Sequence, residues 1–384
     1  MNSWFSFLDS IPVYLRIIMS FGISGIICFC STPFVKAFAY KVGAIDVPKD
    51  NRRMHKKPIP RLGGLAMFTG FLISVLLFIP LKSEIRGILF GVIIIVVLGI
   101  IDDVMALGAK LKFVVQIFAA LVPVLLGVRI EHLPNFNPFS NDLYITFPDW
   151  ISIPLTVLWI VGITNAVNLI DGLDGLAAGV SSIASFTLLI FTFLVPSSLN
   201  MSLLIAALAG CCIGFLPYNF NPAKMFMGDT GATFLGYILA IVSVQGLFKW
   251  YTIISFAVPF LVLGLPIFDT LYAMLRRILS GRSPMSADRG HLHHRLIDMG
   301  FSQKQAVAIL YSISGLLGLS AVLLTNAGPY KVLFMILICV AVFFISVKFI
   351  NILKSRKNSE DNSDVDQDTH EFEIIKDDKD EEDK

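Results

Sequence analysis

Long uninterrupted apolar segments constrain this chain more than any other feature of its sequence. A transmembrane helix needs about 20 mostly apolar residues, and such segments recur along most of the chain. Because backbone polar groups find no water inside a bilayer, each segment is expected to be a helix. The predicted fold is therefore an all-α polytopic membrane protein. We place eleven candidate spans near residues 12–35, 63–81, 87–101, 111–128, 150–168, 175–195, 201–217, 231–248, 252–274, 305–325 and 331–350.

The composition excludes an ordinary soluble domain, because 55% of the residues are hydrophobic and 15% are charged. Residues 1–10 lack the basic start of a cleavable signal peptide. The five cysteines fall in apolar spans without metal-ligand spacing, so we interpret them as buried apolar residues. The loop 129–149, rich in Asn, Pro and Phe, is expected to form a small hairpin or an interfacial belt.

The distribution of Lys and Arg predicts the orientation in the membrane. The loops 38–62 and 276–304 carry seven and six of these residues, and three more in neighbouring loops give sixteen against five on the opposite side. We therefore expect the N-terminus outside, the C-terminus inside and the active site on cytoplasmic loops. Residues 1–353 are expected to form the membrane domain, and 354–384 a disordered acidic cytoplasmic tail.

The segment 165–175, Asn-Ala-Val-Asn-Leu-Ile-Asp-Gly-Leu-Asp-Gly, joins two apolar spans. Asn168 and Asp171 are three residues apart, as are Asp171 and Asp174, so on a helix each pair shares a face. Carboxylates without partners at a membrane boundary repel each other, and a bound cation would offset that repulsion. The segment suits a Mg²⁺-phosphate site. The alternative is a tight turn in which Asp174 caps the following helix.

Two further polar segments lie on the same predicted side. In the first loop, cationic residues around His55, Lys56 and Arg61 could bind a diphosphate or a lipid phosphate, or could simply anchor the loop at the membrane. Prolines hold this loop extended, and the Gly-Gly pair after it permits close packing. Asp102 and Asp103 directly follow an apolar span, which suits a base or a metal-bridging pair, or else a hydrated helix end.

The segment 226–231 places Phe226 and Asp229 in a loop with glycines. Phe226 could stack on a nucleobase and Asp229 could hold a metal, whereas an interfacial aromatic residue is the alternative. Asp269 lies inside a span, where acids are functional candidates, although a packing hydrogen bond or a link to a basic residue is equally compatible.

The last basic loop contains three histidines within four residues, flanked by arginines. No Cys or paired helical His completes a zinc site, so we interpret the loop as a set of hydrogen-bond donors to phosphate and sugar. Its polar residues are Asp288, Arg289, His291, His293, His294 and Arg295.

Together these five segments, in this order over roughly residues 40–300, resemble the polyprenyl-phosphate N-acetylhexosamine-1-phosphate transferases of the glycosyltransferase 4 type. Arg61-Leu-Gly-Gly and the run from Asp288 to Arg295 look like the N-acetylglucosamine branch, which includes the enzymes that start teichoic acid synthesis. The resemblance implies Mg²⁺-dependent transfer of N-acetylglucosamine 1-phosphate from UDP-N-acetylglucosamine to undecaprenyl phosphate, with release of UMP. Direct attack by the lipid phosphate is expected, and a covalent intermediate on Asp102 or Asp103 is the alternative.

The resemblance also implies a role for each motif residue. The expected catalytic residues are Asp102, Asp103, Asp171, His293 and His294. The expected substrate-binding residues are His55, Lys56, Arg61, Asn168, Asp174, Phe226, Asp288, Arg289, His291 and Arg295. The expected metal ligands are Asp229, as the main one, and Asp102. Asp102 and Asp103 would orient or deprotonate the lipid phosphate, Asn168 and Asp171 would position the uridine diphosphate, and Phe226 would stack on uracil.

The implied cofactor is Mg²⁺, or Mn²⁺ in its place, and the implied location is the plasma membrane, with the lipid bilayer as a partner and no nucleic acid. A homodimer is one open assembly. The nearest alternative function is a phospho-N-acetylmuramoyl-pentapeptide transferase. An alternative of another class is a transporter or channel with carboxylate coupling sites, but the acids cluster at helix ends and no internal repeat is evident.

Overall fold

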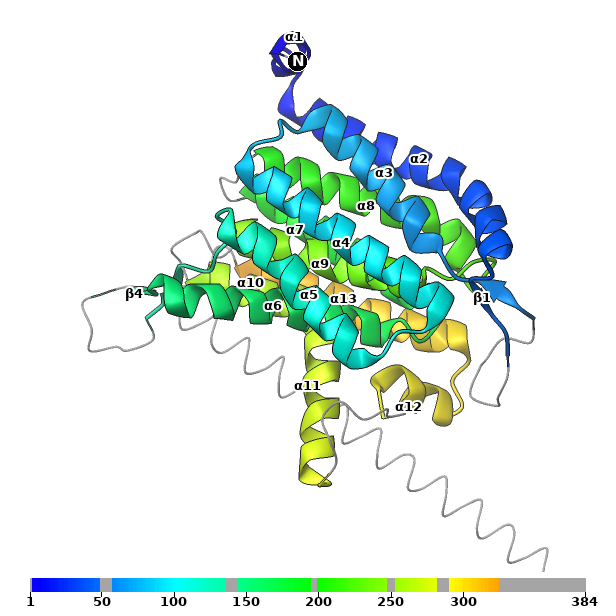
Figure 1. Cartoon of the computed structure of the whole chain (residues 1–384). Helices are drawn as coiled ribbons and strands as arrows, with labels where there is room; N and C mark the ends of the chain where they lie inside the picture. Colours follow the sequence, from blue (N-terminus) through cyan, green and yellow to red (C-terminus); the bar gives the residue numbers. More distant parts are fainter. Residues whose placement is uncertain are drawn as a thin grey trace, which may run out of the picture.

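The computed structural model describes residues 2–48, 57–135, 142, 144–194, 199–246, 253–281 and 290–324, and these ranges are mostly helical (Figure 1). The helices are α1 (Asn2–Asp9), α2 (Val13–Val42), α3 (Gly63–Phe78), α4 (Ser83–Met105), α5 (Ala109–Leu125), α6 (Asp149–Ile170), α7 (Leu176–Leu194), α8 (Leu199–Asn219), α9 (Gly228–Gly246), α10 (Ile253–Val262), α11 (Gly264–Leu279), α12 (Leu292–Asp298) and α13 (Gln303–Leu324). The strands are β1 (Ile45–Asp46), β2 (Ile59–Pro60), β3 (His132–Pro134) and β4 (Tyr144–Thr146).

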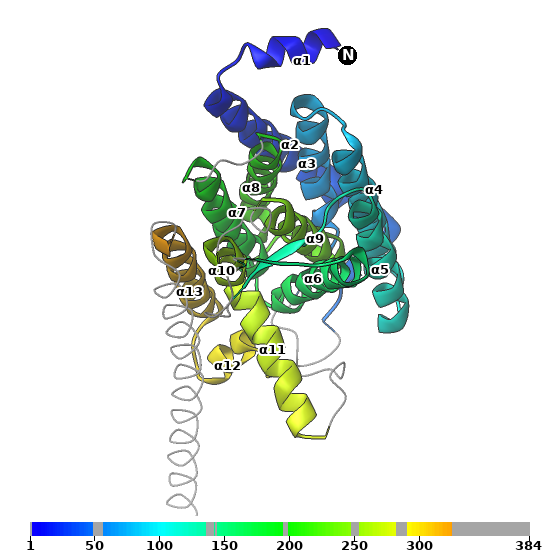
Figure 2. The ribbon, with the colours of Figure 1, turned by 90° about the vertical axis from the view of Figure 1, so that its left-hand side faces the viewer.

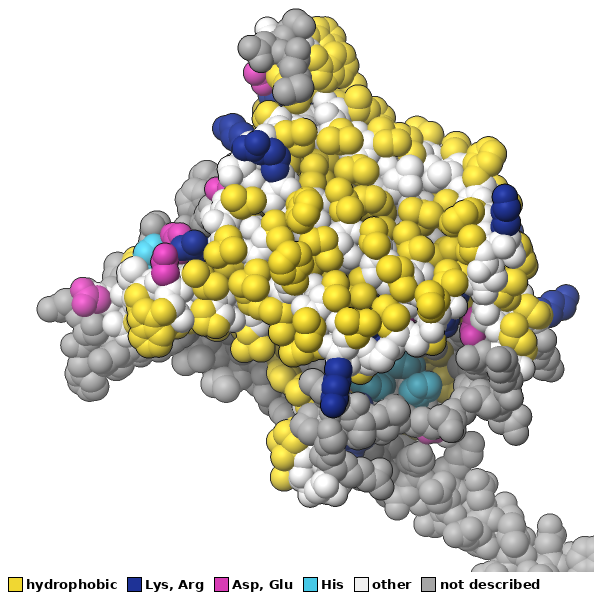
Figure 3. Space-filling model, in the orientation of Figure 1, with side chains coloured by type: hydrophobic (Ala, Val, Ile, Leu, Met, Phe, Trp, Pro, Cys, Tyr) yellow, Lys and Arg dark blue, Asp and Glu magenta, His cyan; other side chains and the backbone are white. Residues whose placement is uncertain are grey.

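Six of the described helices are long and apolar enough to cross a membrane, namely α2, α4, α6, α7, α8 and α13. Large apolar side chains such as Phe34, Phe90 and Phe118 are exposed on α2, α4 and α5. Figure 3 shows that apolar side chains cover the face formed by these helices, while Lys and Arg lie along its margins. An exposed apolar surface of this extent suits lipid as the surrounding solvent. The chain is a multi-pass, all-helical membrane protein.

The ten predicted spans between residues 12 and 325 each coincide with helical structure, whereas the span at 331–350 and the tail 354–384 lie outside the described residues. The number of spans and their orientation therefore stay predictions. Within the loops, β3 pairs with β4 in an antiparallel hairpin, as expected for 129–149. The extended first loop contributes β1 and β2, which also pair antiparallel.

Two predicted spans differ from the structure. The span at 87–101 is longer than predicted, because α4 continues to Met105 and includes the Asp pair. The span at 252–274 is not one helix but two, α10 and α11, with the break at Leu263. Pro266 has no N–H to extend the helical ladder back into α10, which explains the break. α11 then projects beyond the bundle (Figures 1 and 2).

α9 forms the centre of the bundle, packed against α3, α4, α6, α7 and α8 (Figure 2). Two glycines bring neighbouring backbones against its first turn. Gly64 of α3 lies directly against Gly231, and Gly99 of α4 lies directly against Thr230. A side chain at either glycine would collide with backbone atoms, so only glycine permits this approach. The start of α9 is therefore fixed between α3 and α4.

Gly64→Ala is expected to lower the melting temperature, because the added methyl group would force apart the backbones of α3 and α9. Overpacking of this kind typically costs about 1–3 kcal/mol. Gly162→Ala is the matched control, since nothing lies within 4 Å of a Cβ at that exposed helical position. Thermal unfolding of both variants in detergent checks the prediction, and equal melting temperatures for Gly64→Ala and wild type would contradict it.

Candidate active site

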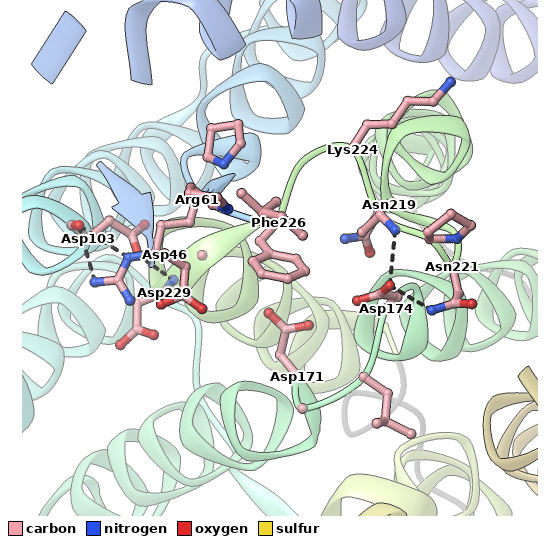
Figure 4. A pocket seen from close by; sticks show the side chains of 18 of the residues that line it. Asp46, Arg61, Asp103, Asp171, Asp174, Asn219, Asn221, Lys224, Phe226 and Asp229 are labelled. Atoms are coloured by element: carbon pink, nitrogen blue, oxygen red, sulfur yellow. Dashed lines mark hydrogen bonds and ion pairs between the residues drawn. The ribbon is translucent and has the colours of Figure 1, made fainter. Parts of the chain in front are cut away.

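A cavity of about 980 Å³ is lined by residues of α2, α4, α5, α6, α8, α9, α12 and α13 and of loops near their ends (Figure 4). At what we call the acidic end lie Asp46, Arg61, Asp103 and Asp229. At what we call the amide end lie Asp174, Asn219, Asn221 and Lys224. Phe226 and Asp171 lie between the two ends. Residues far apart in the sequence thus share one cavity.

Asp103, in the last turn of α4, binds the N-terminus of α9. Its Oδ1 accepts a hydrogen bond from the backbone N–H of Asp229 at 3.0 Å. Its Oδ2 accepts one from the backbone N–H of Thr230 at 3.1 Å and one from the Thr230 hydroxyl at 2.6 Å. A carboxylate here satisfies otherwise unpaired N–H groups and interacts favourably with the helix dipole. Asp103 therefore fixes the position of Asp229 at the start of α9.

Lys112 of α5 joins the other member of the Asp pair to the same site. Its Nζ lies 2.9 Å from Asp102 Oδ2 and 2.9 Å from Asp229 Oδ2. The second oxygen of Asp102 accepts a hydrogen bond of 2.6 Å from the backbone N–H of Leu107, in the turn after α4. Both Asp102 oxygens are thus occupied, and Lys112 neutralises part of the acidic end from inside the protein.

The first loop is attached directly to the loop before α9. The backbone N–H of Phe226 donates to Pro60 at 2.9 Å, and the N–H of Gly63 donates to the Phe226 carbonyl at 3.0 Å. Between these bonds, the Arg61 guanidinium donates to the Asp103 carbonyl at 3.2 and 3.3 Å. This backbone pairing places Arg61 and Phe226 on the same wall of the cavity. The sequence did not predict that these two segments would contact each other.

The turn 171–175 carries acids into the cavity and is attached to the amide end. Asn219, which is buried, accepts a hydrogen bond of 3.1 Å from the Gly175 N–H and donates one of 3.1 Å to Met225. Asp174 accepts hydrogen bonds from Asn221 at 2.9 Å and from the Ala223 N–H at 3.0 Å. α6 ends at Ile170, so a tight turn is present as the alternative predicted, and its acids also line the cavity. Asp174 does not cap the following helix as predicted, because its carboxylate binds Asn221 and Ala223 instead.

The carboxylate of Asp171 has no hydrogen-bond or ion-pair partner among the described residues, although the backbone N–H donates to Asn168 at 3.2 Å. Burial in the cavity, followed by the charges of Asp229, Asp103 and Asp174, raises the pKa of Asp171 to about 8. A carboxylate held near other carboxylates without compensation is destabilising unless a cation or a donor group arrives. A cation bound beside Asp171 would therefore stabilise this part of the site.

The histidine segment, residues 290–295, continues into α12 and approaches the cavity from that side. His294 lines the cavity, whereas His293 is buried beneath it, with ring centroids 4.2 Å apart. The Nε2 of His293 has no hydrogen-bond partner among the described residues and packs against Gly172, where any side chain would collide with it. Burial, together with the neighbouring histidines, lowers the pKa of His293 to about 3, so this imidazole is neutral at physiological pH.

The structure brings together many of the predicted site residues and sets others apart. Those that line the cavity are Arg61, Asp103, Asn168, Asp171, Asp174, Phe226, Asp229 and His294. Those that are described but lie outside its lining are Asp102, His291, His293 and Arg295. Those outside the described residues are His55, Lys56, Asp288 and Arg289. The chemical role of each residue stays a prediction.

Sequence reasoning missed several residues of the site. Lys112 was counted only among the positive charges that predict the orientation in the membrane, although it binds Asp102 and Asp229. Thr230 was not considered as a partner of Asp103. Asn219 and Asn221 connect the two loops at the amide end. Two asparagines directly after an apolar span and before a proline are a signal that could have singled out this segment.

The oxygen ligands that could hold a metal are Asp229 and Asp171. Within the described residues, no group of three His, Cys, Asp or Glu side chains is placed to enclose a metal by itself. Mg²⁺ commonly binds through one or two carboxylates and completes its shell with water and substrate phosphates. Among the described residues the Asp171 carboxylate has no partner, and Asp229 has only its Oδ2 bound, by Lys112, so this donor set fits Mg²⁺. Asp102, predicted as a second ligand, has both oxygens occupied and fits less well.

Comparison with known proteins adds independent evidence. The sequence profile of glycosyl transferase family 4 matches residues 85–247. A probable undecaprenyl-phosphate N-acetylglucosaminyl 1-phosphate transferase of Bacillus subtilis is 44% identical over 85% of this chain and 90% of that protein. A decaprenyl-phosphate N-acetylglucosaminephosphotransferase of Mycolicibacterium smegmatis is 36% identical over 78% of this chain and 79% of that protein. A phospho-N-acetylmuramoyl-pentapeptide-transferase of Staphylococcus aureus is 34% identical over 69% of this chain and 86% of that protein.

Asp171→Asn is expected to stabilise the metal-free protein at alkaline pH. In the unfolded chain the pKa of this carboxyl group is about 3.8. Between pH 3.8 and about 8 the folded protein therefore binds one proton more than the unfolded chain, so its stability falls as the pH rises. In EDTA, the variant should therefore melt above wild type at about pH 8.5 and close to it near pH 4. Glu131→Gln, which removes an exposed carboxylate just before β3, is the control. A wild type that melts at or above the variant at alkaline pH would refute this.

Proposed function

Since the chain belongs to the polyprenyl-phosphate N-acetylhexosamine-1-phosphate transferases of glycosyl transferase family 4, we propose that it transfers N-acetylglucosamine 1-phosphate from UDP-N-acetylglucosamine to undecaprenyl phosphate. An oxygen of the lipid phosphate attacks the β-phosphorus of the donor. The bond from that phosphorus to the bridging oxygen breaks, UMP leaves, and a lipid-linked diphospho-sugar forms. Such a product is the first intermediate of a cell-wall polymer such as teichoic acid.

The observation that carries the proposal is the arrangement of charges in the cavity. Asp103 comes from the end of α4, Asp171 from the turn after α6 and Asp229 from the start of α9. Arg61 and Lys112 line the same cavity. Transfer of a phosphoryl group between two anions needs charge neutralisation and in-line positioning more than covalent chemistry. Fixed cations beside carboxylates that can hold a metal meet both needs.

The metal would be held by Asp229 and Asp171. Bound there, Mg²⁺ would neutralise charge on the donor diphosphate. Asp103 keeps Asp229 in place through the first turn of α9. Because the oxygens of Asp103 already accept three hydrogen bonds from that turn, they are poorly placed to act as a nucleophile. This favours direct attack by the lipid phosphate over a covalent enzyme intermediate.

The nucleotide would extend from the acidic end toward the amide end. Phe226 lies between the two ends, where its ring can stack on uracil. Asp174 and Asn221 offer hydrogen-bonding groups farther along the cavity. His294, on the wall nearest α12, is placed to contact the phosphate or the sugar.

The cavity would open to the cytoplasm at the plasma membrane. The first loop, with its excess of Lys and Arg, contributes Lys57 and Arg61 to the lining, so the positive-inside rule assigns the cavity to the cytoplasmic side. A soluble nucleotide sugar is available there, while the tail of the acceptor stays in the bilayer.

Purified protein with UDP-N-acetylglucosamine, undecaprenyl phosphate and Mg²⁺ should release UMP, and Asp229→Asn should lower the rate at least about 100-fold. The loss follows from removal of a metal ligand beside the reacting phosphate. Asp9→Asn serves as the matched control and should retain wild-type turnover. A donor panel that includes UDP-N-acetylmuramoyl-pentapeptide tests the sugar. Product formed only from the pentapeptide donor, or undiminished turnover by Asp229→Asn, would overturn the assignment.

Phe226→Ala is expected to raise the KM for the nucleotide sugar by about tenfold, because base stacking on an aromatic ring is worth about 1–3 kcal/mol. The KM for the lipid acceptor should change by less than about twofold, since stacking concerns only the donor. Phe226→Tyr keeps the ring and is the control. Steady-state kinetics with each substrate varied in turn measures both constants, and a rise confined to the acceptor KM would exclude the stacking role.

A further inference from the structure

One face of α11 holds the histidine segment, while the opposite face is apolar and exposed. Asp269, Tyr272 and Arg276 are spaced so that they lie along one side of the helix, and all three contact residues between 290 and 295. The exposed apolar residues on α11 are Leu271, Met274, Leu275, Ile278 and Leu279. The polar face is thus used for contacts inside the protein, and it determines where α12 lies.

Asp269 makes the most buried of these contacts. Its Oδ2 lies 2.9 Å from Nδ1 of His291, and its Oδ1 accepts a hydrogen bond of 2.8 Å from the backbone N–H of Leu292, the first residue of α12. The side chains of Asp269 and His291 are only 4% and 6% exposed. Both oxygens of a buried carboxylate therefore serve a single purpose, which is to hold the start of α12.

The next two residues on this face extend the same attachment. Arg276 donates a hydrogen bond of 3.0 Å to the carbonyl of Gly290. The ring of Tyr272 contacts two guanidinium groups, with its centroid 5.6 Å from that of Arg276 and 4.9 Å from that of Arg295. Both ends of the histidine segment are thereby attached to α11.

From Asp269 a continuous series of contacts reaches the cavity. The rings of His291 and His293 are nearly parallel, with centroids 5.9 Å apart, and the ring of His293 contacts that of His294 at 4.2 Å. His294 lines the cavity. His293 also packs against Gly172, the residue next to Asp171. A displacement of α12 would therefore move the imidazole of His294 within the cavity.

We propose that Asp269 is a positioning residue for the transfer reaction, which holds α12 so that His294 keeps its place beside the substrates. The proposal rests on the proposed function, in which His294 contacts phosphate or sugar. Asp269 itself does not line the cavity. Its effect is exerted through His291 and α12, so it should change the rate of the bound complex rather than the binding of either substrate.

Asp269→Asn is expected to lower kcat by about 10- to 100-fold, while the KM values of both substrates stay within about threefold. The decisive measurement is a double-mutant cycle with His294→Ala. If Asp269 acts through the histidine segment, Asp269→Asn should cost less than about threefold in the His294→Ala background. Independent effects that multiply in the double variant, or a full wild-type rate for Asp269→Asn, would overturn the proposal.

The control for this cycle is Asp149→Asn, which also breaks a carboxylate ion pair, with Arg129 at 2.9 Å, but at the far end of α6. It should leave kcat unchanged. If Asp269→Asn does not fold, Arg276→Ala removes a less buried contact of the same face. It should give a smaller loss that likewise disappears in the His294→Ala background, and a loss that persists there would count against the proposal.

A measurement without turnover separates this proposal from the proposed function. Spin labels at the exposed positions Asp298 on α12 and Lys110 on α5, with the native cysteines replaced, report the position of α12. The distance distribution should broaden or shift in Asp269→Asn and not in Asp149→Asn. An unchanged distribution would refute the positioning role even in an active enzyme. A wild type inactive with every donor would instead refute the proposed function.

Discussion

The hydrogen bonds between the Asp103 carboxylate and the first turn of α9 are the contact on which the rest of the site depends. It joins the end of one apolar helix to the beginning of another across the middle of the bundle. Because the first turn of α9 is packed against α3 and α4 and Thr230 is buried, its N–H groups would otherwise lack partners. The same contact sets the position of Asp229, so packing and site geometry have a common origin.

The site also concentrates charge that a stable protein without a function would avoid. Asp171 is held near Asp229, Asp103 and Asp174, and among the described residues it has no compensating partner. Lys112 and Arg61 compensate only the acidic end. Such local instability is typical of sites that bind a cation or a developing charge. The similarity to transferases, rather than this instability, separates the chain from the transporter alternative.

The sequence predicted most of the helices and much of the cavity lining, because apolar segments and polar motifs are local signals. It could not separate the roles of Asp102 and Asp103. Adjacent helical residues point about 100° apart, and only the packing of α5 and α9 shows that one faces Lys112 and the other faces Thr230. For the same reason the sequence could not decide whether Asp269 has a functional or a packing role, because its partner His291 is 22 residues farther along the chain. The break in the ninth span could have been read from Pro266, which lies within the predicted helix.

The pairing of the first loop with the segment before α9 has a consequence for biosynthesis. Pro60, Gly63 and Gly64 exchange backbone hydrogen bonds with Phe226 and Met227, which the ribosome adds only after six further helices have been made. Until then, the wall that contains Arg61 lacks the segment that it pairs with. Membrane insertion of the early helices and completion of the cavity are thus separate events, and a nascent chain that ends before residue 226 contains the early motifs without a working catalytic centre.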